Sequence, residues 1–89
     1  MSTAENYAVV FTPRARRETR RLDLQTTLRI AAAIDSLASN PRPSGCLKVK
    51  TSESLWRIRV GDWRIGYEID DQTHQITIIT VGHRREFYN

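Results

Sequence analysis

Three arginines in the C-terminal half stand where they could act together on a phosphate group. The dipeptide Gly61-Asp62 separates two segments of alternating apolar residues, which is the signal of a β-hairpin with a two-residue turn. In that register Arg59 lies opposite Arg64, and Arg57 lies opposite Gly66. Like charges directly opposite one another destabilise a sheet, so a purely structural sheet gains nothing from this pairing. The pattern therefore predicts a concave cationic surface prepared for phosphate, the alternative being an ordinary solvated strand face.

The other face of the predicted hairpin supports the same register. It collects six apolar side chains in three cross-strand pairs, namely Val60 with Trp63, Ile58 with Ile65 and Trp56 with Tyr67. A slip of one residue would move every side chain to the opposite face, so this segregation is a strong constraint. We expect the apolar face to belong to the core and the arginine face to carry the site.

The N-terminal half must position this hairpin. Residues 7–11 predict a short strand, and Thr12 is the expected cap of a helix over 13–22 that begins with a proline. A second helix is predicted over 24–38, and the proline-containing segment 40–45 ends it. Its apolar stripe consists of Leu24, Leu28, Ala31, Ile34 and Leu37, with Ile30 and Ala38 beside it.

Strand-like alternation then fills the rest of the chain, with strands expected at 55–60, 63–70 and 75–81. The order predicts an α+β fold in a single domain over residues 1–89. We expect an N-terminal strand, an antiparallel two-helix hairpin, and a three- to four-stranded antiparallel meander that forms a twisted sheet. The helices should pack on one face of that sheet.

Composition narrows the classes of partner. Fourteen basic residues against ten acidic ones give a formal charge of +4, and all the basic residues except Lys48 and Lys50 are arginine. This balance favours a polyanion or an acidic protein as partner, against the alternative of a generic soluble surface. No apolar stretch approaches the ~18 residues of a membrane span. The lone Cys46 and the lack of a secretory signal fit a reducing cytoplasm, where we expect the protein to act.

Motifs for cofactors and metals are missing from the sequence. It has no phosphate-binding glycine loop, no metal-spaced His/Cys cluster and no nucleophile elbow, so we expect neither a cofactor nor a metal. The pair Asp70-Asp71 is interpreted as turn chemistry, Cys46 as a buried or incidental thiol, and His74 as a solvent-exposed, passive residue of a polar turn.

Two segments carry a resemblance to a known family. The strings LWRIRVGDWRIGYEI over 55–69 and VGHRREFY over 81–88 resemble the RelE/ParE superfamily, the toxic halves of type II toxin–antitoxin pairs. The hallmark of this superfamily is an R-hydrophobic-G-D/N-aromatic-R-hydrophobic-x-Y hairpin, followed by a G-H/K-R-x-x-x-Y tail. The resemblance extends over essentially the whole chain, and it is more specific for the superfamily than for a branch.

The RelE-like branch implies a ribosome-dependent endoribonuclease that cuts mRNA in the ribosomal A site. The implied reaction is metal-free attack by the ribose 2′-OH on the adjacent phosphate, which leaves a 2′,3′-cyclic phosphate and a 5′-OH. Carried over by motif, Arg64 would hold the scissile phosphate, Arg84 would act on the leaving group or phosphate, and Tyr88 would stack on or orient the nucleotide. The implied phosphate-binding set is Arg57, Arg59, Lys48 and Lys50.

Proton transfer needs a group that titrates near the operating pH, and arginine does not. His83 is the residue of the matched motifs that titrates near neutrality, so we predict that it serves in acid–base catalysis. Lys48, Lys50, Glu53 and Tyr88 remain alternatives. The predicted catalytic set is therefore Arg64, Arg84, His83 and Tyr88.

Two other functions stay open at this point. One is a ParE-like inhibitor of DNA gyrase, and the other is a degenerate toxin that acts only in an autoregulatory complex. Retention of Arg64, Arg84 and Tyr88 favours the nuclease, because a gyrase poison needs no phosphate-clamping set. The expected partners are a small RelB-like antitoxin with acidic and apolar residues, the ribosome and its mRNA, and operator DNA bound through the antitoxin.

Overall fold

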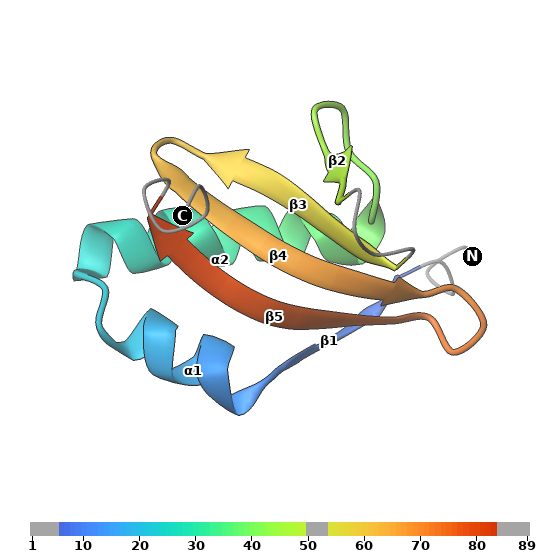
Figure 1. The fold of residues 1–89 in the computed structure, drawn as a ribbon, viewed down its shortest axis with the longest axis horizontal. Helices are drawn as coiled ribbons and strands as arrows, with labels where there is room; N and C mark the ends of the chain where they lie inside the picture. The colour runs from blue at the N-terminus through green and yellow to red at the C-terminus, as the bar shows by residue number, and fades with distance from the viewer. Residues whose placement is uncertain (1–5, 50–53, 84–89) are drawn as a thin grey trace.

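The computed structural model describes residues 6–49 and 54–83, and it confirms the predicted α+β fold (Figure 1). The elements are β1 (Ala8–Phe11), α1 (Pro13–Arg20), α2 (Leu24–Ser39), β2 (Leu47–Lys48), β3 (Leu55–Val60), β4 (Trp63–Asp70) and β5 (Gln75–His83). Strands β3 and β4 have the predicted bounds. β5 continues two residues further than expected and includes His83, because its pairing with β4 extends to Trp63.

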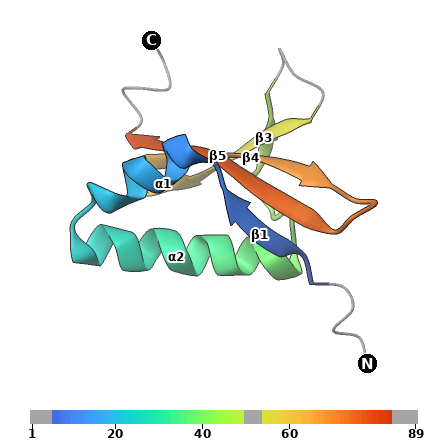
Figure 2. The same ribbon diagram turned by 90° about the horizontal axis from the view of Figure 1, so that it is seen from below.

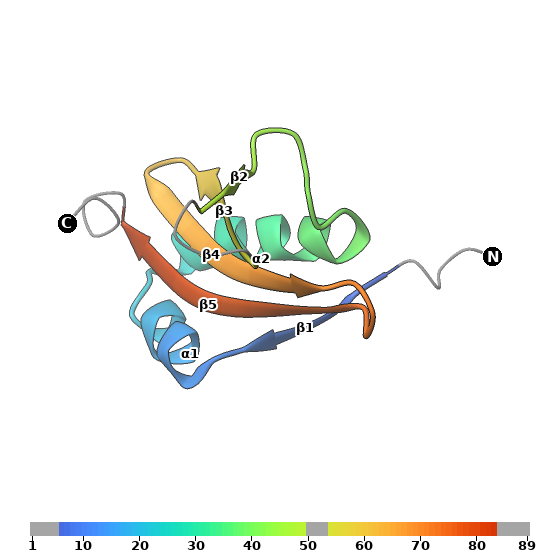
Figure 3. The same ribbon diagram turned by 45° about the vertical axis from the view of Figure 1, so that its right-hand side comes forward.

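The five strands form one mixed sheet in the order β1-β5-β4-β3-β2. Strands β2 to β5 are the predicted antiparallel meander. β1 joins the other edge in parallel with β5, from Ala8 opposite Gln75 to Phe11 opposite Ile78. In Figure 3, β1 runs beside β5 and then leaves the sheet into α1. β5 therefore continues beyond the end of its neighbour.

The β3–β4 hairpin has the predicted register at every pair, including Val60 opposite Trp63 and Arg59 opposite Arg64. Gly61 occupies the first turn position with φ +62°, a left-handed conformation that glycine adopts without strain. A Cβ at this position would also stand 2.6 Å from Nη2 of Arg29. The turn thus requires glycine for its backbone conformation, whereas the exposed end of Arg29 can move aside.

The core forms between α2 and the apolar face of the sheet, with α2 lying along one side of the strands in Figure 2. It contains Ala15, Ile30, Ile34, Leu37, Ile58, Ile65, Tyr67, Ile76, Ile78 and Val81. The hydroxyl of the fully buried Tyr67 donates a hydrogen bond of 2.7 Å to the carbonyl of Pro41. Burial raises the pKa of this phenol, so it stays protonated and keeps donating.

The predicted stripe of α2 is wrong in its first half. The buried row is Ile30, Ile34 and Leu37, whereas Leu24 and Leu28 are 73% and 61% exposed. The two rows differ by one residue, or about 100° around a helix, so only one of them can face the sheet. The row of Ile30, Ile34 and Leu37 faces the sheet. Among the described residues, no helix is long and apolar enough to cross a membrane.

Candidate active site

The arginine face predicted for the hairpin extends over three strands. Arg59 on β3 lies opposite Arg64 on β4, which in turn lies opposite Gly82 on β5. Because cross-strand neighbours share a face, these residues form one row across the sheet, on the side away from the apolar core residues. Arg57 and Gly66 belong to the next row of the same face. We call these five residues the arginine face.

The arginines of this face differ in exposure. Arg64 is only 7% exposed and is the one buried charged residue among those the structure describes, with Nη1 donating to the carbonyl of Trp63 at 3.4 Å. Arg57 is half-buried, and Arg59 is exposed with Nε donating to the carbonyl of Gly61 at 3.1 Å. The expectation of an open cationic surface therefore holds for Arg59 but not for Arg64.

Glycines adjoin Arg64 on the arginine face. Gly82 is directly opposite it, Gly66 is two residues along the same strand, and both are buried. Glycine is unfavourable in a strand interior and marks places where another group approaches the backbone closely. The pattern places two residues without side chains next to Arg64 on this face.

His83 lies at the end of the sheet, opposite Trp63. The two rings meet edge to face, with centroids 5.5 Å apart and an interplanar angle of 80°. Strand alternation places this pair on the face opposite Arg64 and Gly82. His83 thus follows Gly82, the residue opposite Arg64, but its side chain lies on the other face of the sheet.

The lysines of the predicted phosphate-binding set are placed differently. Lys48 is exposed and lies opposite Trp56, so alternation directs it to the core side of the edge, and Leu47 takes the place beside Arg57. Lys50 lies outside the described residues. So do three other predicted residues, Glu53, Arg84 and Tyr88.

An acidic residue that the sequence reasoning did not single out contacts the strand that ends at His83. Glu18 of α1 accepts hydrogen bonds from Oγ1 of Thr80 and from the main-chain N–H of Val81, both at 2.8 Å. The signal available in the sequence was one carboxylate among the arginines of the first helix, a position easily interpreted as surface. Thr12 caps the same helix as predicted, accepting from the N–H of Ala15 at 3.0 Å.

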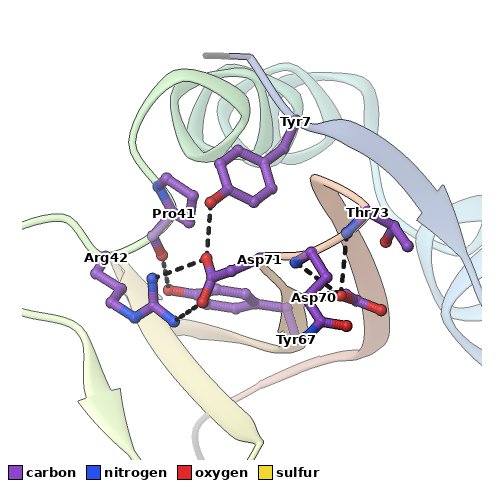
Figure 4. Close-up of polar contacts among 8 residues, drawn as sticks. Tyr7, Pro41, Arg42, Tyr67, Asp70, Asp71 and Thr73 are labelled. Carbon is purple, nitrogen blue, oxygen red and sulfur yellow. Dashed lines mark hydrogen bonds and ion pairs between the residues drawn. The ribbon is translucent and has the colours of Figure 1, made fainter. Parts of the chain in front are cut away.

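A polar cluster ties together the opposite end of the sheet (Figure 4). Asp71 accepts from the Tyr7 hydroxyl at 2.7 Å and from Arg42 at 2.9 and 3.3 Å. The bonds from Arg42 and then Tyr7 lower the pKa of Asp71 below its ordinary value. Arg42 also lies over the ring of Trp56, 5.2 Å from its centroid. The cluster fixes the loop after α2 to the β4–β5 turn, far from Arg64.

Asp70 confirms the turn chemistry predicted for its pair. Its Oδ1 accepts from the N–H groups of Gln72 and Thr73 at 3.0 and 3.2 Å, which closes the turn before β5. His74, which was predicted to be a passive residue of this turn, is exposed and stacks on Tyr7 with ring centroids 4.8 Å apart.

Comparison with known proteins gives consistent likenesses. Residues 9–88 match the family model described as ParE toxin of type II toxin-antitoxin system, parDE. The chain is 34% identical over 93 residues to Toxin RelE of Mycobacterium tuberculosis (strain ATCC 25618 / H37Rv), covering 99% of this chain and 92% of the relative.

Solved structures give the same fold. An archaeal RelE-RelB complex from Pyrococcus horikoshii OT3 superposes with a TM-score of 0.79 at 23% identity, covering 89% of this chain and 96% of that one. The toxin-antitoxin complex RelBE2 from Mycobacterium tuberculosis superposes with a TM-score of 0.75 at 28% identity, covering 89% and 99%. The residues matched by the family model, 9–88, include the arginine face.

Proposed function

Because the chain belongs to the RelE/ParE superfamily of toxins from type II toxin–antitoxin systems, we propose that it is an endoribonuclease that cleaves mRNA in the ribosomal A site. The proposed reaction is attack by a ribose 2′-OH on the adjacent phosphate. The 2′-oxygen–phosphorus bond forms, the bond from phosphorus to the 5′-oxygen breaks, and the 2′ proton is removed while the 5′-oxygen gains one. The products are a 2′,3′-cyclic phosphate and a 5′-OH.

The observation that carries this proposal is the row of Arg59 and Arg64 beside two buried glycines. The transition state of this reaction concentrates negative charge on the phosphate oxygens, and fixed positive charge aimed at them lowers the barrier. A guanidinium offers two parallel donors that match two phosphate oxygens. Arg64 is held by burial before the substrate arrives, and the exposed Arg59 can follow the mRNA backbone.

The roles of the remaining residues are part of the proposal. Arg84 acts on the phosphate or the leaving oxygen, Tyr88 orients the nucleotide, and Arg57 binds the neighbouring backbone. His83 exchanges the proton from the end of the sheet, because histidine is the side chain most often used for general acid–base catalysis. Its placement beside Trp63 means that the reacting oxygen must approach at this edge, not above the centre of the arginine face.

The proposed partner is a small antitoxin. Two of the similar solved structures are complexes of a RelE toxin with a RelB antitoxin, which supports a cognate antitoxin for this chain. With a net charge of +4 the toxin favours an acidic, partly apolar segment that covers the arginine face. The complex would bind operator DNA through the antitoxin, and the free toxin would act on ribosomes in the cytoplasm.

The test is single-turnover cleavage of an mRNA on purified ribosomes stalled with an empty A site. We expect cleavage within one codon and 5′-OH ends on the downstream fragment. Arg20→Ala, which removes one exposed charge from the end of α1, is the matched control for Arg64→Ala. Intact mRNA with wild-type toxin would refute the nuclease.

A second candidate, inhibition of DNA gyrase, is favoured by one observation, the match to a family model named for ParE toxin. Induction of the chain in cells separates the two. The nuclease stops protein synthesis first and shortens mRNA, whereas a gyrase inhibitor stops replication first and leaves mRNA intact.

A further inference from the structure

Glu18 is the only acidic residue of α1, and its carboxylate is turned toward β5. Its side chain is 24% exposed, against 67% for Arg14, which approaches it from one turn earlier in the helix. The two oxygens have separate partners. Oε2 accepts a hydrogen bond from Nε of Arg14 at 3.2 Å, and Oε1 accepts both hydrogen bonds from β5.

The contact lies where the sheet loses a strand. Parallel pairing between β1 and β5 ends at Phe11 opposite Ile78, yet β5 continues for five residues to His83. An unpartnered strand edge presents N–H and C=O groups that need other partners. Thr12 is the first such partner along β5. Its N–H donates to the carbonyl of Ile78, and its hydroxyl donates to the carbonyl of Ile79. Glu18 is the next partner, since it accepts a hydrogen bond from the N–H of Val81.

The β4–β5 ladder is irregular at the same place. Gly66 lies opposite Thr80 but Tyr67 lies opposite Ile78, so Ile79 is an extra residue on β5. A bulge of this kind bends a strand and changes where the following side chains point. Glu18 therefore contacts the two residues directly after the bulge, immediately before Gly82 and His83.

We propose that Glu18 is a positioning residue of the toxin's active site. By holding the N–H of Val81 it fixes the register after the bulge, and so keeps Gly82 opposite Arg64 and His83 opposite Trp63. This inference rests on the proposed nuclease function for its effect on rate, but its geometric part does not. The acceptor oxygen of Glu18 holds β5 in this register, and the negative charge is not needed for it.

Because both β5 bonds end on the same oxygen, one substitution separates the acceptor from the charge. Glu18→Gln retains a carbonyl oxygen for Thr80 and Val81 and loses the ion pair and hydrogen bond with Arg14. Glu18→Ala removes the ion pair with Arg14 and both hydrogen bonds from β5. Thr80→Val removes one of the two donors and keeps the β-branched shape. Ala32→Gly weakens α2 at an exposed site away from β5 and serves as a control for lowered stability.

The first measurement is amide hydrogen exchange and NMR of the folded variants. Loss of the Glu18 acceptor leaves the part-buried N–H of Val81 unsatisfied, which should raise exchange of this amide on the order of 10- to 100-fold. Glu18→Ala should show this increase and should shift the signals of Gly82 and the His83 ring. Glu18→Gln should stay within about threefold of wild type. An unchanged Val81 amide in Glu18→Ala would overturn the proposal.

The second measurement is single-turnover cleavage on ribosomes. We expect Glu18→Ala to lower the rate at saturating toxin by ~10-fold or more while the half-saturating concentration stays the same, since a misplaced group slows chemistry and not binding. Glu18→Gln should restore the rate, and Ala32→Gly should not lower it. Equal losses in Glu18→Gln and Glu18→Ala would overturn the role of the acceptor oxygen. If wild type does not cleave, the proposed function fails, and exchange at Val81 still decides the role of Glu18.

Discussion

The burial of Arg64 makes its substitution the sharpest test of the arginine face. Arg64→Ala removes a guanidinium that is 7% exposed and lies between Arg59 and Gly82 in its row. Two free energies change, the barrier of the reaction and the stability of the fold. They are measured separately, so the magnitude of each can be worked out on its own.

The effect on the barrier follows from one preorganised charge-assisted contact to the transition state. Removing such a donor costs about 3–4 kcal/mol, or 10²–10³ in rate. Arg64→Lys keeps the charge but loses the two parallel donors, so it should recover only part of this, about tenfold. Arg59→Ala removes an exposed side chain from the same row and should cost less than Arg64→Ala.

The effect on stability is smaller. Losing a buried charged group with its hydrogen bonds costs about 1–3 kcal/mol. Relief of the repulsion between Arg64 and Arg59 returns about 0.2–1 kcal/mol. The net loss of about 1–2 kcal/mol lowers Tm by roughly 5–15 °C in a domain of this size. Assays well below the Tm of the variant therefore report the barrier and not unfolding.

The assay is single-turnover cleavage on stalled ribosomes, with circular dichroism and thermal unfolding of the same samples. A folded Arg64→Ala protein that cleaves at the wild-type rate would remove Arg64 from the site. A variant that is slow only in proportion to its unfolded fraction would make Arg64 a structural residue.

Three further perturbations test other parts of the structure. Gly61→Ala places an alanine at a backbone φ of +62°, so it should lower the free energy of unfolding by about 1–2 kcal/mol in urea, and an unchanged midpoint would contradict that conformation. Asp71 has a lowered pKa in the folded state, so its bond to Arg42 stabilises the fold above the ordinary carboxyl pKa and is lost as the pH falls below it. Wild type should therefore exceed Asp71→Asn in Tm at pH 7, with the gap closing as the pH falls through the lowered folded-state pKa of Asp71; a constant gap would show that the charge is irrelevant. His83→Gln should slow cleavage by about 10²–10⁴ and flatten the pH–rate profile near neutrality, and an unchanged profile would assign the proton to another group.

Local patterns were enough to predict the elements that surround the site. The Gly61-Asp62 turn and the alternation beside it determine the hairpin register, because a one-residue slip would expose the whole apolar face. The same alternation places Arg57, Arg59 and Arg64 together. Thr12 and Pro13 mark the start of α1 by chemistry that depends only on neighbouring residues.

Features that depend on distant parts of the chain were not predicted. Alternation tells which face Arg64 occupies but not how deeply it is buried. No local signal shows that β1 pairs in parallel with β5, or which of two adjacent rows of α2 faces the sheet. Glu18 was missed for the same reason, since its two partners on β5 lie more than sixty residues away in the sequence.

The parallel pairing of β1 with β5 has a consequence for how this toxin folds. The first of the described strands pairs with the last of them, and the hydroxyl of Thr12 donates to the carbonyl of Ile79 across a sequence separation of 67 residues. Closing a loop of this length precedes any gain from the contacts it allows, so this edge forms late in folding. The same closure brings Glu18 to β5 and completes the end of the sheet that holds Arg64, Gly82 and His83. A chain without β5 lacks Gly82, the neighbour of Arg64 in its row, so the arginine face is complete only after the two ends of the described fold have met.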